Sequence, residues 1–247
     1  MKLTREDRAA RKAAFRKMSL GKKADYLYTY FKLPIFLGLL AFALLCSTVY
    51  RQITKKSVRL YSAYINVSVG DALEAYLDPG FISSIGENPQ KAEVSFYKGL
   101  YLSDAPSQED HQYSYASRLK VMAAIEAKEL DVVFMNQEAY DILSHSGYLY
   151  ELPGLLAWNA DLLNTAEPYL ATNTVILEDN AIEYQLGEAA RYEATTQEAV
   201  NGMEVSALPV FAQAGFPDHV YFGVIANSPR LNAALQYIEY LVGPAWN

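Results

Sequence analysis

The residues of this sequence that could do chemistry are aromatic, amide and acidic side chains near predicted strand and helix ends, and they indicate ligand binding. Tyrosine is unusually frequent, with 20 residues against two tryptophans. Aromatic faces can stack on a sugar or a peptide, and open α/β sheets bind ligands beyond the carboxyl ends of their strands. The candidate ligand-binding residues are Asp71, Tyr97, Tyr101, Asn136, Gln137, Tyr148, Trp158 and Tyr221. The alternative for each ring is packing in the core, and for Asn136 it is capping a helix.

The histidines and acidic residues form no recognisable metal or catalytic pattern. His111, His145 and His219 are far apart in the sequence and no cysteine accompanies them. The acidic pair within residues 178–180 lacks the loop pattern of a calcium site and is typical of a turn. The sequence also lacks G-x-S-x-G, H-E-x-x-H, the P-loop and G-x-G-x-x-G. We therefore expect a protein that is not an enzyme and uses no metal or cofactor.

Charge is divided unevenly along the chain. Residues 1–32 hold ten Lys/Arg and three acidic residues, whereas residues 33–247 hold eleven Lys/Arg and 25 acidic residues. A basic tail is attracted to anionic lipid. An acidic domain argues against nucleic acid as a partner, because nucleic-acid binding needs a positive surface. The acidity could also serve only to keep the domain soluble.

Residues 33–50 predict a membrane-spanning helix. This run of 18 residues carries no charge, and ten of the residues are Leu, Ile, Phe or Val. At about 1.5 Å per residue it reaches roughly 27 Å, close to the thickness of a bilayer core. The charge pattern favours a cytoplasmic N-terminus and an extracellular C-terminal domain, held by an uncleaved signal-anchor. The alternatives are a buried helix, cleavage after the A-x-A triplet at residues 41–43, and lipidation of Cys46, the only cysteine.

These observations divide the chain into four parts. They are a basic cytoplasmic tail (1–32), a transmembrane helix (33–50), a linker (51–60) and an extracytoplasmic α/β domain (61–247). The residues beyond the membrane helix are numerous enough for one domain with its own core, or for two small lobes.

The first half of the domain alternates predicted strands with predicted helices, which favours an α/β fold with a mainly parallel sheet. The predicted strands of this half cover residues 63–69, 93–98 and 130–135, and the predicted helices cover 72–77, 114–129 and 137–145. In the second half we expect a helix at 158–169, a hairpin of strands 173–177 and 181–186, and strands at 205–211 and 219–226. A final helix would begin at Ser228-Pro229 and bury Leu231, Leu235, Ile238 and Val242.

Two stretches resemble the bacterial extracellular solute-binding proteins. In that family a helix precedes the motif x-x-G-x-x-D and a buried strand, and the next helix ends at a G-x-L-x-x-L turn. Residues 120–152 are similar to this unit, although Lys128 stands where the family often has glycine. Residues 221–241 resemble the family's return strand and closing helix. The leader at residues 23–34 is similar to that of membrane-anchored proteins of anaerobic Gram-positive bacteria.

The resemblance covers about residues 61–243 and implies a fold like that of the type 2 periplasmic binding proteins. By analogy it implies capture of a small molecule or short peptide for an ABC-type importer, with the lipid bilayer and membrane permease subunits as partners. Complete members have two lobes of similar size that close on a ligand. Residues 148–210 are few for a second lobe, so we expect that lobe to be reduced. The alternative is an interaction or scaffold domain of a bacterial membrane complex that kept the fold and lost the ligand.

Overall fold

The computed structural model describes residues 14, 16 and 18–243, and it divides the chain into two compact units between residues 55 and 56. The main element of the first unit is the helix α2, Leu20–Thr54, which contains Pro34. Most of the predicted tail, residues 1–32, lies outside the described residues or has no described side chains. In the part of the chain that the structure describes, no helix combines the length and the hydropathy that a membrane crossing needs.

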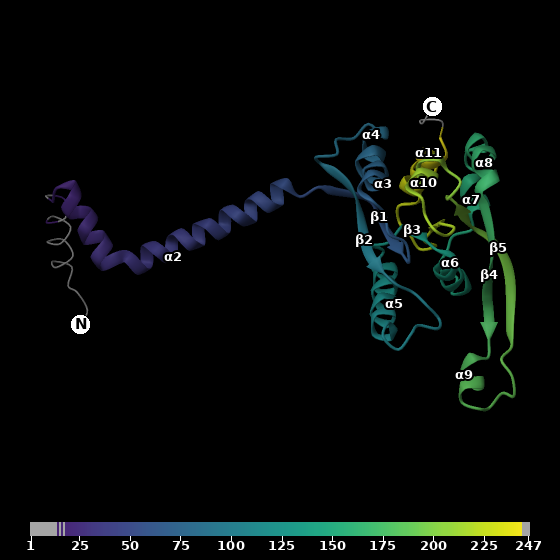
Figure 1. The fold of residues 1–247 in the computed structure, drawn as a ribbon. Coiled ribbons are helices and arrows are strands. Elements are labelled where there is room, and N and C mark those ends of the chain that lie inside the picture. The colour runs from purple at the N-terminus through teal and green to yellow at the C-terminus, as the bar shows by residue number, and fades with distance from the viewer. Residues whose placement is uncertain (1–13, 15, 17, 244–247) are drawn as a thin grey trace. The chain divides into compact units, whose positions relative to one another are not determined.

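The second unit is a six-stranded sheet with helices on both faces (Figure 1). Its strands are β1 (Ser57–Ile65), β2 (Ala92–Leu100), β3 (Val132–Met135), β4 (Leu170–Asp179), β5 (Ala194–Glu204) and β6 (Tyr221–Val224). Its helices are α3 (Asp71–Ala75), the π-helix η1 (Tyr76–Gly80), α4 (Phe81–Ser84), α5 (His111–Glu126), α6 (Gln137–His145), α7 (Leu152–Leu156), α8 (Ala160–Ala166), the 3-10 helix η2 (Glu167–Tyr169), α9 (Ala181–Gln185), α10 (Pro209–Ala214) and α11 (Leu231–Val242). The predicted α/β class is confirmed.

Strand direction changes halfway across this sheet, whose order is β2-β1-β3-β6-β5-β4. β1 pairs in parallel with β2 and β3, whereas the pairs β3–β6, β6–β5 and β5–β4 are antiparallel. The expectation of a mainly parallel sheet is therefore right for the first three strands and wrong for the others. Strands joined by a crossover helix run parallel, but β4 and β5 are joined at one end as a hairpin and must run antiparallel.

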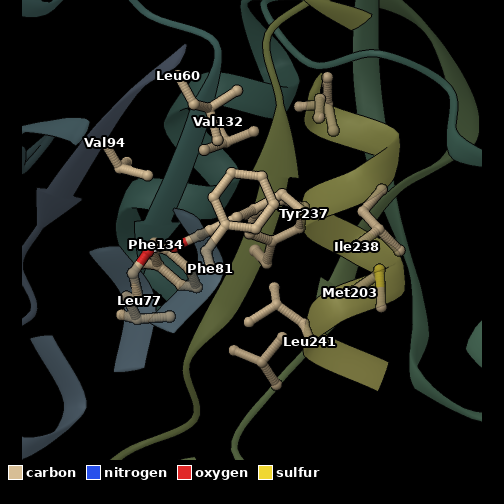
Figure 2. Close-up of a cluster of buried hydrophobic side chains, with 14 of the residues drawn as sticks. Leu60, Leu77, Phe81, Val94, Val132, Phe134, Met203, Tyr237, Ile238 and Leu241 are labelled. Atoms are coloured by element: carbon tan, nitrogen blue, oxygen red, sulfur yellow. Dashed lines mark hydrogen bonds between the residues drawn. The ribbon is translucent and has the colours of Figure 1, made fainter. Parts of the chain in front are cut away.

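Alternate residues of the central strands pack into two hydrophobic clusters, one on each face of the sheet. Tyr64 of β1 and Phe134 of β3 lie in the cluster that also contains residues of α3, α4, α7, α8, α10 and α11. The ring centroids of Phe134 and Tyr237 of α11 are 6.2 Å apart. Figure 2 labels both residues in this cluster. Ile65 and Met135 point to the other face and pack with α5 and α6. Because both faces are covered, the central strands can be apolar at almost every position.

The first strand begins and ends earlier than predicted. β1 runs over Ser57–Ile65, whereas the alternation in the sequence placed a strand at residues 63–69. Asn66 ends β1 because its backbone is left-handed, with φ of 58°. The helix α2 continues through Thr54, so most of the segment expected to be a linker, residues 51–60, is regular structure.

The Asp-Pro-Gly sequence at residues 78–80 does not end the helix predicted at 72–77. The chain instead widens into one π-helical turn and continues as α4. Pro79 has no N–H to donate, and a π-turn tolerates this irregularity. Tyr76 and Tyr240 then hold the turn, since each hydroxyl donates to the other's carbonyl oxygen at 3.1 Å. A side chain at Gly80 would collide with the Tyr240 hydroxyl, 2.5 Å from its Cβ position.

The first strand of the predicted hairpin lies within β4, but its second strand and the strand predicted at residues 205–211 are wrong. Residues 181–185 form the helix α9, and the partner of β4 is β5, at residues 194–204. The first five residues of β5 are exposed on both faces, so they lack the apolar alternation that indicates a strand. Residues 209–214 are the helix α10. The helix predicted at 158–169 is α8 and η2, and it begins after Asn159, whose side chain caps it.

The last helix packs on a face slightly different from the predicted one. Its buried residues are Ala234, Tyr237, Ile238 and Leu241. Of the four predicted positions Ile238 is fully buried, and Leu231, Leu235 and Val242 are partly buried against the same hydrophobic cluster. Ser228 is not the cap of this helix, because α11 begins at Leu231 and Arg230 is at the N-cap position. The Ser228 hydroxyl donates to Asp131 Oδ1 at 2.6 Å and accepts from the Arg230 N–H at 3.0 Å.

Candidate functional site

The carboxyl ends of the three parallel strands meet at one edge of the sheet, where ligands of α/β proteins bind. Asn66 follows β1, Leu102 follows β2 and Asn136 follows β3. The Asn66 side-chain amide donates to the Leu102 carbonyl at 2.6 Å and to Asn136 Oδ1 at 3.1 Å. Its own oxygen accepts from the Leu102 N–H at 2.8 Å. One side chain therefore ties all three strand ends together.

The loop after β2 closes the same edge from the side. Ser103 is buried, and its hydroxyl donates to Glu138 Oε1 of α6 at 2.6 Å. Arg118 of α5 donates to the Ser103 carbonyl at 3.4 Å and to Asp104 Oδ1 at 3.0 Å. We call the residues Asn66, Leu102, Ser103, Asn136 and Glu138 the closed edge. Its polar side chains are hydrogen bonded to one another and to the backbone.

Three of the predicted ligand residues at this edge have structural partners. Asn136 accepts from the Ala139 N–H at 3.0 Å, which confirms the helix-cap interpretation. Gln137 is exposed and donates to Asp141 Oδ1 at 2.7 Å. Tyr101 stacks on Tyr113, with centroids 6.4 Å apart. The fourth, Asp71, is an exposed residue in the first turn of α3.

The remaining four candidates lie in different places. Tyr97 of β2 is half-buried under the Lys120 ammonium, which is 5.5 Å from the ring centroid. Tyr148 lines a cavity of about 180 Å³ between α5 and α6. Trp158 is 87% exposed between α7 and α8. Tyr221 starts β6 and stacks on Tyr140 of α6 at 4.7 Å. The structure does not gather the predicted rings around one cavity.

Burial raises the pKa of several tyrosines and keeps their hydroxyls neutral. Desolvation raises the pKa of Tyr221, and the nearby Glu204 and Asp141 carboxylates raise it further. The pKa of Tyr97 is raised chiefly by burial, then by Glu129. These shifts move both hydroxyls further from ionisation at neutral pH.

Sequence reasoning missed an arm that extends from the sheet. Residues 172–200 of β4, β5 and their connection form a two-stranded ribbon with α9 at its end (Figure 1). We call residues 172–200 the arm and residues 177–195 its tip. Only Met203 and Glu204 of β5 pair with β6, so the arm's strands pair with each other alone.

A buried polar network joins the base of the arm to α6. The Tyr140 hydroxyl donates to Asn201 Oδ1 at 2.9 Å and also lies 3.0 Å from the Ala171 carbonyl. Asn201 donates to the Ser144 hydroxyl at 2.8 Å, which donates to the Thr174 carbonyl. The sequence carries no signal for this network, because the bonded residues are 30 to 61 positions apart.

At the other end of the central strands, a buried carboxylate holds the sheet to the last helix. Asp131 Oδ2 accepts from the Tyr61 N–H and from Arg230 Nε, both at 2.8 Å, and Asp131 is fully buried. The Arg230 guanidinium also lies over the Tyr61 ring, 4.7 Å from its centroid. This cluster joins β1, β3 and the start of α11, and its charges satisfy one another.

Two larger hollows lie away from the closed edge. An apolar groove of about 530 Å³ runs between α3, η1 and α10, next to Ala72 and Gln213. An open polar hollow of about 600 Å³ lies at the arm's tip, lined by acidic residues and Arg191. Within the described residues, no cluster of three His, Cys, Asp or Glu side chains could hold a metal ion. Comparisons of the chain with family models, curated proteins and solved structures found no match.

Proposed function

We propose that this chain is a membrane-anchored interaction domain, similar to one lobe of a solute-binding protein, that contacts other proteins of a bacterial membrane complex. The closed edge carries this proposal. A ligand site presents a few polar groups, fixed in position, to its ligand. Asn66, Ser103, Asn136 and Glu138 instead use their side chains on one another and on the backbone.

The strand arrangement supports the resemblance to solute-binding proteins. β2, β1 and β3 are parallel, and the predicted return strand, β6, lies antiparallel beside β3 and leads to the closing helix α11. Lys128 adds a local detail, because its φ of 57° is the left-handed conformation that glycine adopts most readily. The residue that replaces the family's frequent glycine thus keeps a glycine-like backbone.

The residues between β3 and β6 support a contact role over solute capture. Leu152 of α7, Leu162 of α8 and Met203 of β5 pack in the same hydrophobic cluster as Leu60 of β1. Residues 56–247 form one compact unit. A protein that captures a solute by closing on it needs two lobes with a hinge between them. The residues between β3 and β6 instead pack into the core of the first lobe.

The anchor at residues 33–50 is part of the proposal. Eight large apolar side chains of α2 are exposed: Leu33, Phe36, Leu37, Leu39, Leu40, Phe42, Leu44 and Leu45. Exposed apolar residues on every side of a helix favour a lipid environment. From the charge pattern we propose a cytoplasmic N-terminus and an extracellular domain, with a permease subunit as one kind of partner.

Solute capture for an ABC-type importer is the competing function, and the groove of about 530 Å³ favours it. This volume falls within the range of small-molecule sites, about 300 to 1,000 Å³. The groove begins at Ala72, next to the predicted ligand residue Asp71.

A thermal-shift screen of the full-length chain in lipid nanodiscs separates the two functions. Sugars, amino acids and short peptides are added at millimolar concentration. A captured solute at 100 times its Kd would stabilise the fold by about 2.7 kcal/mol, a rise in Tm of about 5 to 10 °C. If the chain is an interaction domain, we expect no rise in Tm with sugars, amino acids or short peptides. A rise that is lost in Ala72→Trp, which fills the groove, and kept in Ala116→Trp on α5 would overturn the proposal.

A further inference from the structure

The tip of the arm exposes large apolar side chains that are not part of either hydrophobic cluster. Ile182 of α9 and Leu186 at its C-cap are 69% and 68% exposed, and their spacing of four residues places them on the same side of this helical turn. Leu177, Tyr184 and Tyr192 are also among the exposed large hydrophobic residues. Single exposed apolar residues are common, but five within 16 residues on a protruding arm are typical of an interaction site.

The tip is an ordered element, so this exposure is not that of a frayed loop. Asn180 holds its two sides together, since its amide donates to the Arg191 carbonyl at 3.0 Å and its oxygen accepts from the Glu193 N–H at 2.7 Å. The Tyr192 hydroxyl donates to Asp179 Oδ2 at 3.1 Å. Gly187, with φ of 75°, ends α9 in a left-handed turn.

The arm gains little stability from its own burial. A two-stranded ribbon is marginally stable in water without further packing. Its base is held by the network of Tyr140, Asn201 and Ser144, whereas the hydrogen bonds and ring contact described at its tip join residues of the tip to one another. Docking would remove the apolar side chains of the tip from water.

Charge at the tip indicates the chemistry of the partner. Residues 177–195 contain five acidic residues and one arginine. The hollow of about 600 Å³ at the tip is lined by Glu178, Asp179 and Glu193 together with Arg191. A second copy would be repelled, because residues 56–247 hold 25 acidic residues and nine Lys/Arg. An anionic lipid surface would be repelled for the same reason.

We infer that the tip of the arm docks on a partner protein whose surface presents Lys or Arg around exposed apolar side chains. The apolar residues of α9 supply the buried contact, and the acidic residues select the basic partner and speed the encounter. The inference rests on the proposed interaction function and names the surface and the kind of partner.

The test uses the full-length chain in phosphatidylcholine nanodiscs and a short fluorescent peptide in which Lys and Leu alternate. Fluorescence anisotropy measures the Kd at low and at near-physiological salt. Ile182→Ser with Leu186→Ser, and separately Glu178→Gln with Glu183→Gln and Glu188→Gln, should each weaken binding by about tenfold or more. Leu119→Ser with Met122→Ser is the matched control, because these α5 residues are 50% and 41% exposed. That control should leave the Kd unchanged.

Equal binding by the wild type and the tip variants would overturn the inference, as would equal binding of a peptide in which Glu replaces Lys. Sedimentation measures self-association of the wild type. If the wild type self-associates and the Ile182/Leu186 variant does not, a second copy of the chain occupies the tip, and the inference is overturned. If peptide binding is lost only in the Leu119/Met122 variant, the tip is not the docking surface. The proposed interaction function would then be retained, with its surface elsewhere on the domain. Stabilisation by a small solute would overturn that function instead.

Discussion

Two residues with the same unusual backbone should respond in opposite ways to substitution by glycine. Asn66 has φ of 58° and Lys128 has φ of 57°, both in the left-handed region. Glycine adopts this region without strain, whereas other residues lose about 1 to 2 kcal/mol there. Backbone strain alone would therefore make both Asn66→Gly and Lys128→Gly stabilising.

The side chain of Asn66 reverses that expectation. It makes three hydrogen bonds, of 2.6, 2.8 and 3.1 Å, and two of them involve the backbone of Leu102, which is buried. Each bond contributes about 1 kcal/mol, and a buried N–H left without a partner loses about 1 to 3 kcal/mol. After subtraction of the relieved strain, Asn66→Gly should destabilise the protein by about 2 to 3 kcal/mol.

Lys128 makes its contacts through the backbone, which glycine retains. Its carbonyl accepts from Arg230 Nη2 at 2.6 Å and its N–H donates to the Ile125 carbonyl at 3.0 Å. Lys128→Gly should therefore stabilise the protein by about 0.5 to 1 kcal/mol, since the greater freedom of glycine in the unfolded chain offsets part of the gain.

Urea unfolding of the full-length chain, followed by circular dichroism in detergent micelles, measures both effects. For an m value of about 2 kcal/mol/M, Asn66→Gly should lower the midpoint by about 1 M, and Lys128→Gly should raise it slightly. If Asn66→Gly proved neutral or stabilising, its side chain would not hold the three strand ends. The closed edge would then lose its role in the proposed function.

Two further predictions concern the carboxylates of Asp131, which is fully buried, and Asp78, which is half-buried. Asp131→Ala should destabilise the fold by about 3 to 5 kcal/mol, because it removes the buried carboxylate that pairs with Arg230 and accepts from the Tyr61 N–H. A loss of less than about 1 kcal/mol in urea unfolding would contradict this prediction. Burial raises the pKa of Asp78 above its ordinary 3.8, although the hydrogen bond from the Val94 N–H opposes the shift. The folded state then binds this proton more tightly than the unfolded state, so stability should fall as pH rises from 3.8 through the folded pKa. Asp78→Asn keeps an acceptor for Val94 and should flatten that fall in thermal unfolding measured against pH, whereas a parallel curve would contradict the assignment.

Local signals in the sequence predicted most elements of the first half of the domain, although they misplaced β1 and the end of the helix that follows it. The apolar run at residues 130–135 predicted β3, and Asn136 predicted the start of α6 through its cap. Both features depend on neighbours within a few residues, since a cap bonds to the N–H three positions later. The alternation of strands and helices likewise indicated the parallel half of the sheet.

The second half of the domain depends on partners that are distant in the sequence. The exposed start of β5 is a strand only because β4 pairs with it along the arm. The base of the arm is bonded to α6 through Tyr140 and Asn201, which are 61 residues apart. Propensity and periodicity carry no information on such pairs, because each member is ordinary in its own segment.

The sequence by itself determined the α/β class, the buried central strand, the helix cap and the long apolar run near the N-terminus, because each follows from spacing within one segment. Only the tertiary structure decided whether the strand ends form a binding cleft. Asn66 lies 36 residues from Leu102 and 70 from Asn136, and its left-handed backbone turns one amide toward both. Hydrogen bonds between residues so far apart in the sequence form only when the chain folds. The sequence alone therefore could not predict that these strand ends are bonded to one another.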